Sequence, residues 1–132
     1  MLVPLAHRIQ IFPEKKLIII QYEGEISYDD LVATGLELKA MPDFSEEFNG
    51  VSDFRNAHKN LSIRELKVYA DRIQYKKNTS VKWCSLNSTA KETALTIIFK
   101  EHLEYIHPFE VFSTIKAASE YLRTDLSPYL QD

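Results

Sequence analysis

The apolar run at residues 17–20 (Leu-Ile-Ile-Ile) is the feature that most constrains the fold of this chain. Neighbouring side chains of a β-strand point to opposite faces of the sheet, so an uninterrupted apolar run needs cover on both faces. Strands of this kind are typical of α/β proteins, in which helices pack on both sides of a largely parallel sheet. The run is too short to cross a bilayer, and we therefore expect no membrane association from it.

The remaining segments alternate between strand patterns and capped helices. Residues 8–11 alternate polar and apolar side chains and predict a hairpin with residues 17–22, after which Gly24 is expected to break the strand. Helices are predicted to begin at Ser27, at Ser62, within residues 87–89 and at Ser113. Further strands are predicted within residues 48–54, 81–86 and 109–112.

This order, β-β-α-β-α-β-α-β-α, predicts an α/β fold with a mixed, mostly parallel sheet packed with helices. A chain of 132 residues has the length of one domain, so we expect a single domain over residues 1–132. Residues 124–132 follow the last predicted helix and are expected to fray as a tail.

Composition restricts the partners and the compartment. The net charge is -3 and the basic residues are scattered, which argues against a nucleic-acid partner. Cys84 is the single cysteine and cannot form an internal disulfide, and residues 1–10 lack a basic segment followed by an apolar leader. We therefore expect a cytoplasmic protein. Without a glycine-rich phosphate loop or histidines at metal-binding spacing, we expect no cofactor and no metal.

Polar side chains gather where the third predicted strand ends. Asp53, Arg55 and His58 follow its apolar part, and Ser88 lies at a helix start expected at the same edge of the sheet. A guanidinium, an imidazole and a helix amino terminus could together hold a small anion. Alternatively, Asp53 and Arg55 form a structural pair, His58 lies in solvent and Ser88 only caps its helix.

Three segments carry a resemblance to a known family. Residues 18–26 (IIIQYEGEI), residues 51–55 (VSDFR), and residues 109–112 with 117–122 (FEVF and AASEYL) resemble the STAS fold of anti-sigma-factor antagonists, and in particular small bacterial STAS-like proteins. In that family a serine or threonine in an Asp-Ser-Ser/Thr-Gly stretch after the third strand is phosphorylated. The matching residues 55–62 form a longer predicted loop without tandem hydroxyls or glycine, and Ser62 is the residue nearest to the switch position.

The resemblance implies a non-enzymatic regulatory module that binds a protein partner, with Ser62 as a candidate phosphoswitch. The alternative is a small-anion binder or an enzyme that uses Asp53, Arg55, His58 and Ser88 at the carboxyl edge of the sheet. No catalytic residue is identified, and a homodimer is left open. The two functions are distinguished by whether a protein or a small molecule binds.

Overall fold

The computed structural model describes residues 7–73, 80–103 and 108–131. Apart from one short 3-10 turn (Pro13–Lys15), the elements follow the predicted order. The strands are β1 (His7–Phe12), β2 (Leu17–Ile26), β3 (Asn49–Lys59), β4 (Trp83–Leu86) and β5 (Phe109–Phe112). The helices are α1 (Tyr28–Ala40), α2 (Ile63–Ile73), α3 (Ala90–Leu103) and α4 (Ile115–Leu122).

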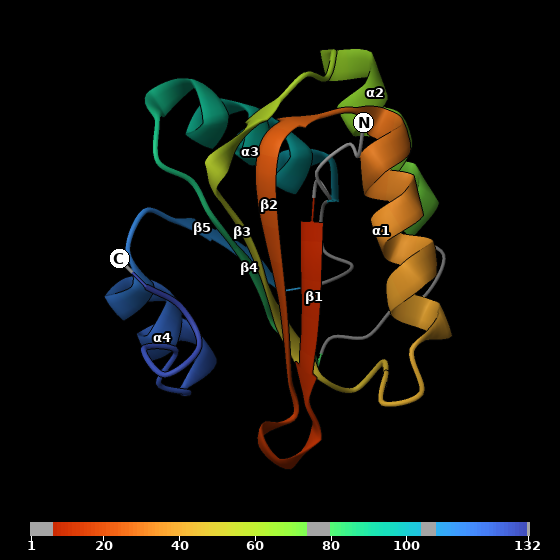
Figure 1. Cartoon of the computed structure of the whole chain (residues 1–132). Helices are drawn as coiled ribbons and strands as arrows, with labels where there is room; N and C mark the ends of the chain where they lie inside the picture. The colour runs from red at the N-terminus through yellow and green to blue at the C-terminus, as the bar shows by residue number, and fades with distance from the viewer. Residues whose placement is uncertain (1–6, 74–79, 104–107, 132) are drawn as a thin grey trace, which may run out of the picture.

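The five strands form one mixed sheet in the order β1-β2-β3-β4-β5 (Figure 1). β1 is antiparallel to β2, because the short turn between them allows only a hairpin, while β2, β3, β4 and β5 are parallel. The α/β class with a mostly parallel sheet is therefore confirmed. Among the described helices, none has both the length and the apolar composition needed to cross a membrane.

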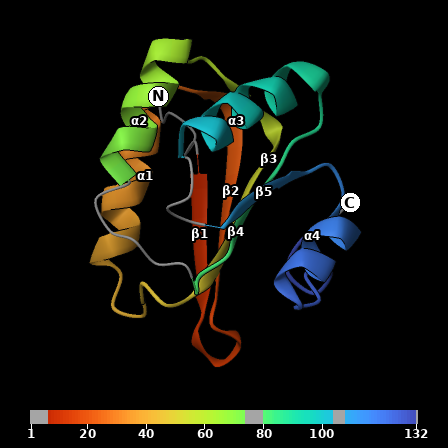
Figure 2. The ribbon, with the colours of Figure 1, turned by 180° about the vertical axis from the view of Figure 1, so that it is seen from behind.

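The helices are divided unequally between the two faces of the sheet. Each step from β2 to β5 moves in the same direction across the sheet, and right-handed crossovers then place α1, α2 and α3 on the same face. α4 follows the last strand and packs on the opposite face, as the two opposite views show (Figures 1 and 2). The sheet is thus covered on both sides, as the apolar run of β2 requires.

The α4 face has a closed apolar core. Leu17, Ile19, Val51 and Cys84 point from the strands to this face and pack against α4. The chain after α4 completes this core. The prediction that residues 124–132 fray is wrong for the described part, which ends at residue 131.

Two leucines explain why this tail is ordered. Leu126 and Leu130 are 0% and 2% exposed, because the eight residues of α4 leave apolar sheet surface to cover. The backbone N–H of Leu126 donates to the Ser119 hydroxyl of α4, and the ring of Tyr129 packs on Phe12 with their centroids 4.3 Å apart. The tail is therefore a structural part of this face.

Two strands continue beyond their predicted ends. Gly24 has a φ of 73°, a conformation that glycine adopts without strain, and β2 continues through it to Ile26. β3 runs to Lys59 rather than ending at Phe54, so most of the expected polar loop at residues 55–62 is strand. β3 pairs with the extended half of β2 along one edge of this polar segment. On the other edge, side chains of Ser88 and Glu92 bond the Arg55 carbonyl and the Lys59 N–H.

The helix starts follow the capping pattern of the sequence, with one correction. Ser27 and Asp30 form the expected capping box of α1, and Ser62 and Glu65 exchange the same two bonds at α2. The last helix is capped by Thr114, whose hydroxyl accepts from the N–H of Ala117, and not by Ser113. These caps satisfy backbone N–H groups that have no partner within the helix.

Candidate functional site

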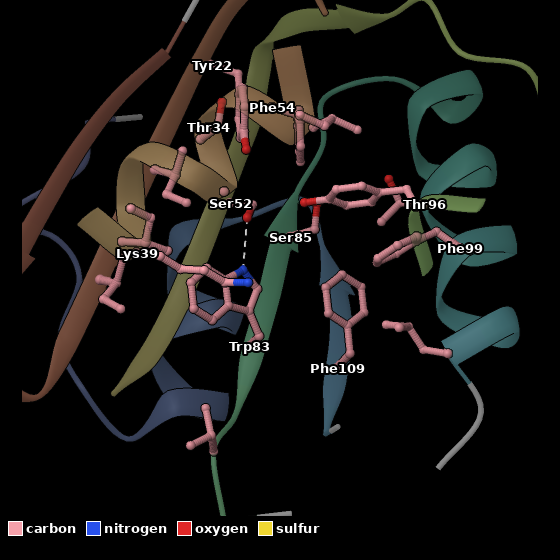
Figure 3. Close-up of a pocket in the computed structure, with 18 of the residues that line it drawn as sticks. Tyr22, Thr34, Lys39, Ser52, Phe54, Trp83, Ser85, Thr96, Phe99 and Phe109 are labelled. Atoms are coloured by element: carbon pink, nitrogen blue, oxygen red, sulfur yellow. Dashed lines mark hydrogen bonds between the residues drawn. The ribbon is translucent and has the colours of Figure 1, made fainter. Parts of the chain in front are cut away.

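A cavity of about 480 Å³ lies between the sheet and the helices α1, α2 and α3 (Figure 3). Helix side chains such as Leu31, Tyr69 and Phe99 form its walls, and the segment from Phe44 to Phe48 lines one side of it. Most of these groups are apolar. A space of this size is in the range of small-molecule sites and much larger than the packing gaps of ordinary protein cores.

The floor of the cavity is made of alternate side chains of four parallel strands. Because successive residues of a strand face opposite ways, one set faces α4 and the other faces the cavity. The floor residues are Ile18, Ile20 and Tyr22 of β2, Ser52 and Phe54 of β3, Trp83 and Ser85 of β4, and Phe109 of β5. The cavity is therefore built on the helix-covered face of the sheet.

Trp83 lies flat on this floor because its neighbour on β3 is a glycine. A Cβ atom at Gly50 would come within 2.2 Å of the Trp83 ring, so no other residue fits there without moving the indole. The indole Nε1–H donates to the Ser52 hydroxyl at 2.8 Å, as Figure 3 shows. This bond fixes the ring orientation and satisfies the indole donor inside an apolar environment. Trp83 is the only tryptophan of the chain, so its fluorescence reports on the cavity.

A β-bulge brings Lys59 to the cavity. The register of β3 against β2 shifts between Gln21 and Glu23, where two steps along β2 correspond to three along β3. The extra residue reverses which side chains face the helices. Ser52 and Phe54 face the cavity before the bulge, and Lys59 lines it after the bulge. Without this irregularity the Lys59 side chain would point to the other face.

Lys59 is a buried cation. Its side chain is 4% exposed, and Nζ lies 2.7 Å from Asn87 Oδ1, 3.6 Å from Glu92 Oε2 and 4.3 Å from the centre of the Phe54 ring. Burial lowers the pKa of Lys59 from 10.5 to about 8, although the Glu92 carboxylate acts in the opposite direction. The ammonium group is thus held inside the fold by an opposite charge, an amide oxygen and an aromatic face.

Four further polar residues complete a polar cluster around Lys59: Ser85, Asn87, Glu92 and Thr96. All four are at most 3% exposed. Asn87 Nδ2 donates to the Ser85 hydroxyl at 3.1 Å, and Glu92 Oε1 accepts from the Lys59 backbone N–H at 2.6 Å. Among the described residues, no hydrogen bond reaches Glu92 Oε2. Lys59, Ser85 and Thr96 are the three members that line the cavity.

Tyrosine and cysteine side chains near the sheet are held in their neutral forms. Burial raises the pKa of Tyr22 well above its usual range and raises that of Tyr69 to about 12, and both tyrosines line the cavity. Burial likewise raises the pKa of Cys84 to about 12, on the α4 face. A thiol with such a pKa is unreactive at neutral pH.

The structure brings together three of the predicted binding residues. Arg55 Nε and Nη2 donate to the two carboxylate oxygens of Asp53 at 2.9 and 3.0 Å, and the Ser88 hydroxyl donates to the Arg55 carbonyl at 2.9 Å. The Asp53 side chain is 4% exposed and that of Arg55 is 15% exposed. The ion pair also holds the backbone, because Asp53 Oδ1 accepts from the N–H of Arg55.

The other two predicted residues lie apart from this pair. The His58 side chain is 78% exposed, with Nδ1 3.9 Å from Glu92 Oε1. Ser62 accepts the backbone N–H of Glu65 at 3.0 Å as the cap of α2. The prediction of a small-anion site at Asp53, Arg55, His58 and Ser88, and that of a phosphoswitch at Ser62, stay predictions.

The polar cluster was not anticipated from the sequence. Lys59 and Glu92 are separated by 33 residues, and each resembles an ordinary surface charge. One signal was present: Glu92, Thr96, Phe99 and Leu103 are spaced as one face of a helix, and these are the buried residues of α3. A charged residue at the start of such a face indicates a buried partner.

Within the described ranges, no group of three or more histidine, cysteine or acidic side chains could hold a metal ion. No protein-family model matches the chain, and a search of curated proteins found no significant match. The resemblance to STAS-like proteins therefore stays a prediction. The cavity and the polar cluster must be interpreted from their own chemistry.

Proposed function

We propose that this protein is a binding module for a small apolar molecule, which occupies the cavity between the sheet and helices α1 to α3. The observation that carries the proposal is the cavity itself, about 480 Å³ with mainly apolar walls and a few polar side chains. Ligand sites typically combine such volumes with predominantly apolar linings and a small number of polar groups.

The cost of the cavity supports this function. Protein cores pack as densely as organic crystals, and every group that lines an unfilled space loses dispersion contacts. Leu31 and Phe99 are nearly buried yet border this space, and larger side chains at Gly35 or Ser52 would reduce it. A bound apolar molecule would restore these contacts, and each CH₂ group transferred from water would contribute about 0.8 kcal/mol.

This proposal keeps the idea of a non-enzymatic module but moves the ligand from the sheet edge into the cavity. A regulatory protein partner stays a second prediction, and it is compatible with a bound ligand. The exposed leucine and isoleucine side chains of Leu36 and Ile63 lie on the outer surfaces of α1 and α2.

The test uses N-phenyl-naphthylamine, a neutral dye whose fluorescence rises in apolar surroundings. We expect one equivalent to bind to the full chain, to change the fluorescence of Trp83, and to be displaced by a saturated hydrocarbon. At a ligand concentration a hundredfold above Kd, binding stabilises the fold by about 2.7 kcal/mol, so the melting temperature must also rise.

A variant that fills the cavity gives the specific control. No atom lies within 4 Å of a Cβ built on Gly35, which borders the cavity, so Gly35→Leu adds a side chain without a direct clash. We expect it to reduce dye affinity at least tenfold. Ala33→Leu adds the same side chain at an exposed position of α1 and should bind like the wild type. Equal binding by wild type and Gly35→Leu would contradict the proposal.

A further inference from the structure

The polar cluster contains two donor groups, Lys59 Nζ and the Ser85 hydroxyl, whose hydrogen-bonding capacity is not filled by short hydrogen bonds among the described residues. Lys59 Nζ carries three N–H groups, and among the described residues it makes one short hydrogen bond, to Asn87 Oδ1. Its other contacts are longer: Glu92 Oε2 lies 3.6 Å away and the centre of the Phe54 ring 4.3 Å away. The Ser85 hydroxyl accepts from Asn87 Nδ2, and within the described ranges no acceptor takes its own proton. Both residues line the cavity and are held by the same Asn87 amide.

The cluster also has a balanced charge. Lys59 and Glu92 are buried together, with side chains 4% and 3% exposed, and their charges cancel. A carboxylate ligand placed beside Lys59 would leave one net negative charge inside the protein. Burying an uncompensated charge is costly, whereas a neutral oxygen that accepts a hydrogen bond adds no charge.

We propose that the ligand is a neutral, mainly apolar carbonyl compound, such as a ketone or an ester, whose oxygen accepts hydrogen bonds from Lys59 and Ser85. This inference rests on the proposed function and adds the head group that the cavity selects. A carbonyl oxygen has two lone pairs and can accept both donors. Its apolar chain extends along the floor made by Trp83 and Phe109.

Three nine-carbon compounds separate the possibilities: nonane, heptyl methyl ketone and nonanoate. Each is titrated by competition with N-phenyl-naphthylamine against the wild type and against the charge-neutral double variant Lys59→Met/Glu92→Gln. The glutamine keeps an oxygen that can accept from the backbone N–H at position 59. For each ligand we compare its affinity for the two proteins. The free energy of removing that ligand from water is the same in both cases and therefore cancels.

We expect the ketone to bind at least tenfold more weakly to the double variant, while the affinity for nonane stays within twofold. A hydrogen bond from a charged donor accounts for a loss of this size. Ser85→Ala gives an independent test that leaves the ion pair in place, and there the ketone alone should lose several-fold. An equal loss for ketone and nonane, or no loss for either, would overturn the inference.

Glu92→Gln tests the charge balance. It removes the carboxylate that balances the charge of Lys59 and raises its pKa. Nonanoate supplies a carboxylate in its place, so it should bind at least tenfold more tightly than to the wild type. An unchanged affinity for nonanoate would show that the charge of Glu92 does not select the head group. If neither nonane nor the dye binds the wild type, the proposed function itself fails. If both bind and none of the variants changes the affinity for the ketone or for nonanoate, only the carbonyl inference fails.

Discussion

At the scale of single residues, Lys59 is both buried and shifted in its pKa, and neither property can be inferred from the sequence around it. Its charge is retained in the interior by Glu92 and Asn87, and burial lowers its pKa from 10.5 to about 8. The unfolded chain therefore holds this proton more tightly than the folded one. Between about pH 8 and pH 10.5 unfolding takes up a proton at Lys59, and the contribution of this group to stability increases with pH.

The measurable consequence is a difference between two pH profiles. From pH 8 to pH 9 the wild type should gain about 1 kcal/mol in unfolding free energy relative to Lys59→Met/Glu92→Gln, since one pH unit corresponds to about 1.4 kcal/mol per proton. Cys84 acts in the opposite direction, because burial raises its pKa from 9.0 to about 12, but it is present in both proteins. Urea denaturation at both pH values measures the difference. Parallel profiles would place the titration of Lys59 near its ordinary value.

At the scale of elements, the sequence predicted the helices and strands well where the signal is local. Ser62 and Glu65 form a capping box within four residues, and this identifies the start of α2 without reference to the rest of the fold. The end of β3 was missed because it depends on a distant partner. Residues 55–59 are mostly polar, and only their pairing with the second half of β2 keeps them in the sheet.

The polar cluster depends on the same extension of β3, because Lys59 is the last residue of that strand. The bulge that turns Lys59 to the cavity arises from the register between β2 and β3, and register is a property of two strands rather than of one. The partner of Lys59 is Glu92 of α3, which follows the next strand. A long-range pair of this kind leaves no spacing rule in the sequence. The helical spacing of Glu92 with Thr96, Phe99 and Leu103 indicates that Glu92 is buried, but it does not identify Lys59 as its partner.

The cap of α2 separates a structural role of Ser62 from a regulatory one. Ser62→Ala should lower the unfolding free energy by about 1 kcal/mol, because the N–H of Glu65 loses its acceptor. Ser62→Asp should stay within about 0.5 kcal/mol of the wild type, because aspartate is an equally good cap and favours the positive helix end. Urea denaturation measures both. An effect of Ser62→Asp on the binding of a protein partner could then be assigned to its charge. A large loss of stability in Ser62→Asp would contradict the expectation that aspartate replaces serine as the cap.

At the scale of the whole molecule, the two faces of the sheet are packed differently. The α4 face is closed by Leu126 and Leu130 and has a continuous apolar core, while the other face holds the cavity and the polar cluster. Alternate side chains of the same strand contribute to the two faces: Ile18 and Ile20 of β2 face the cavity, and Leu17 and Ile19 face α4. Both faces contain buried apolar side chains that stabilise the fold, but only those of one face also line the cavity.

Two equivalent truncations, one on each face of the sheet, test whether only the face with the cavity affects ligand binding. Leu126 is 0% exposed on the α4 face and Leu103 is 2% exposed at the cavity wall, so either change to alanine should cost about 2–5 kcal/mol of unfolding free energy. Only Leu103→Ala changes the shape of the cavity, and it alone should shift the affinity for N-phenyl-naphthylamine by threefold or more. Leu126→Ala should bind the dye within twofold of the wild type, measured well below its melting temperature. An equal shift in both variants would mean that the sheet couples its two faces, and packing against α4 would then help to set the shape of the cavity.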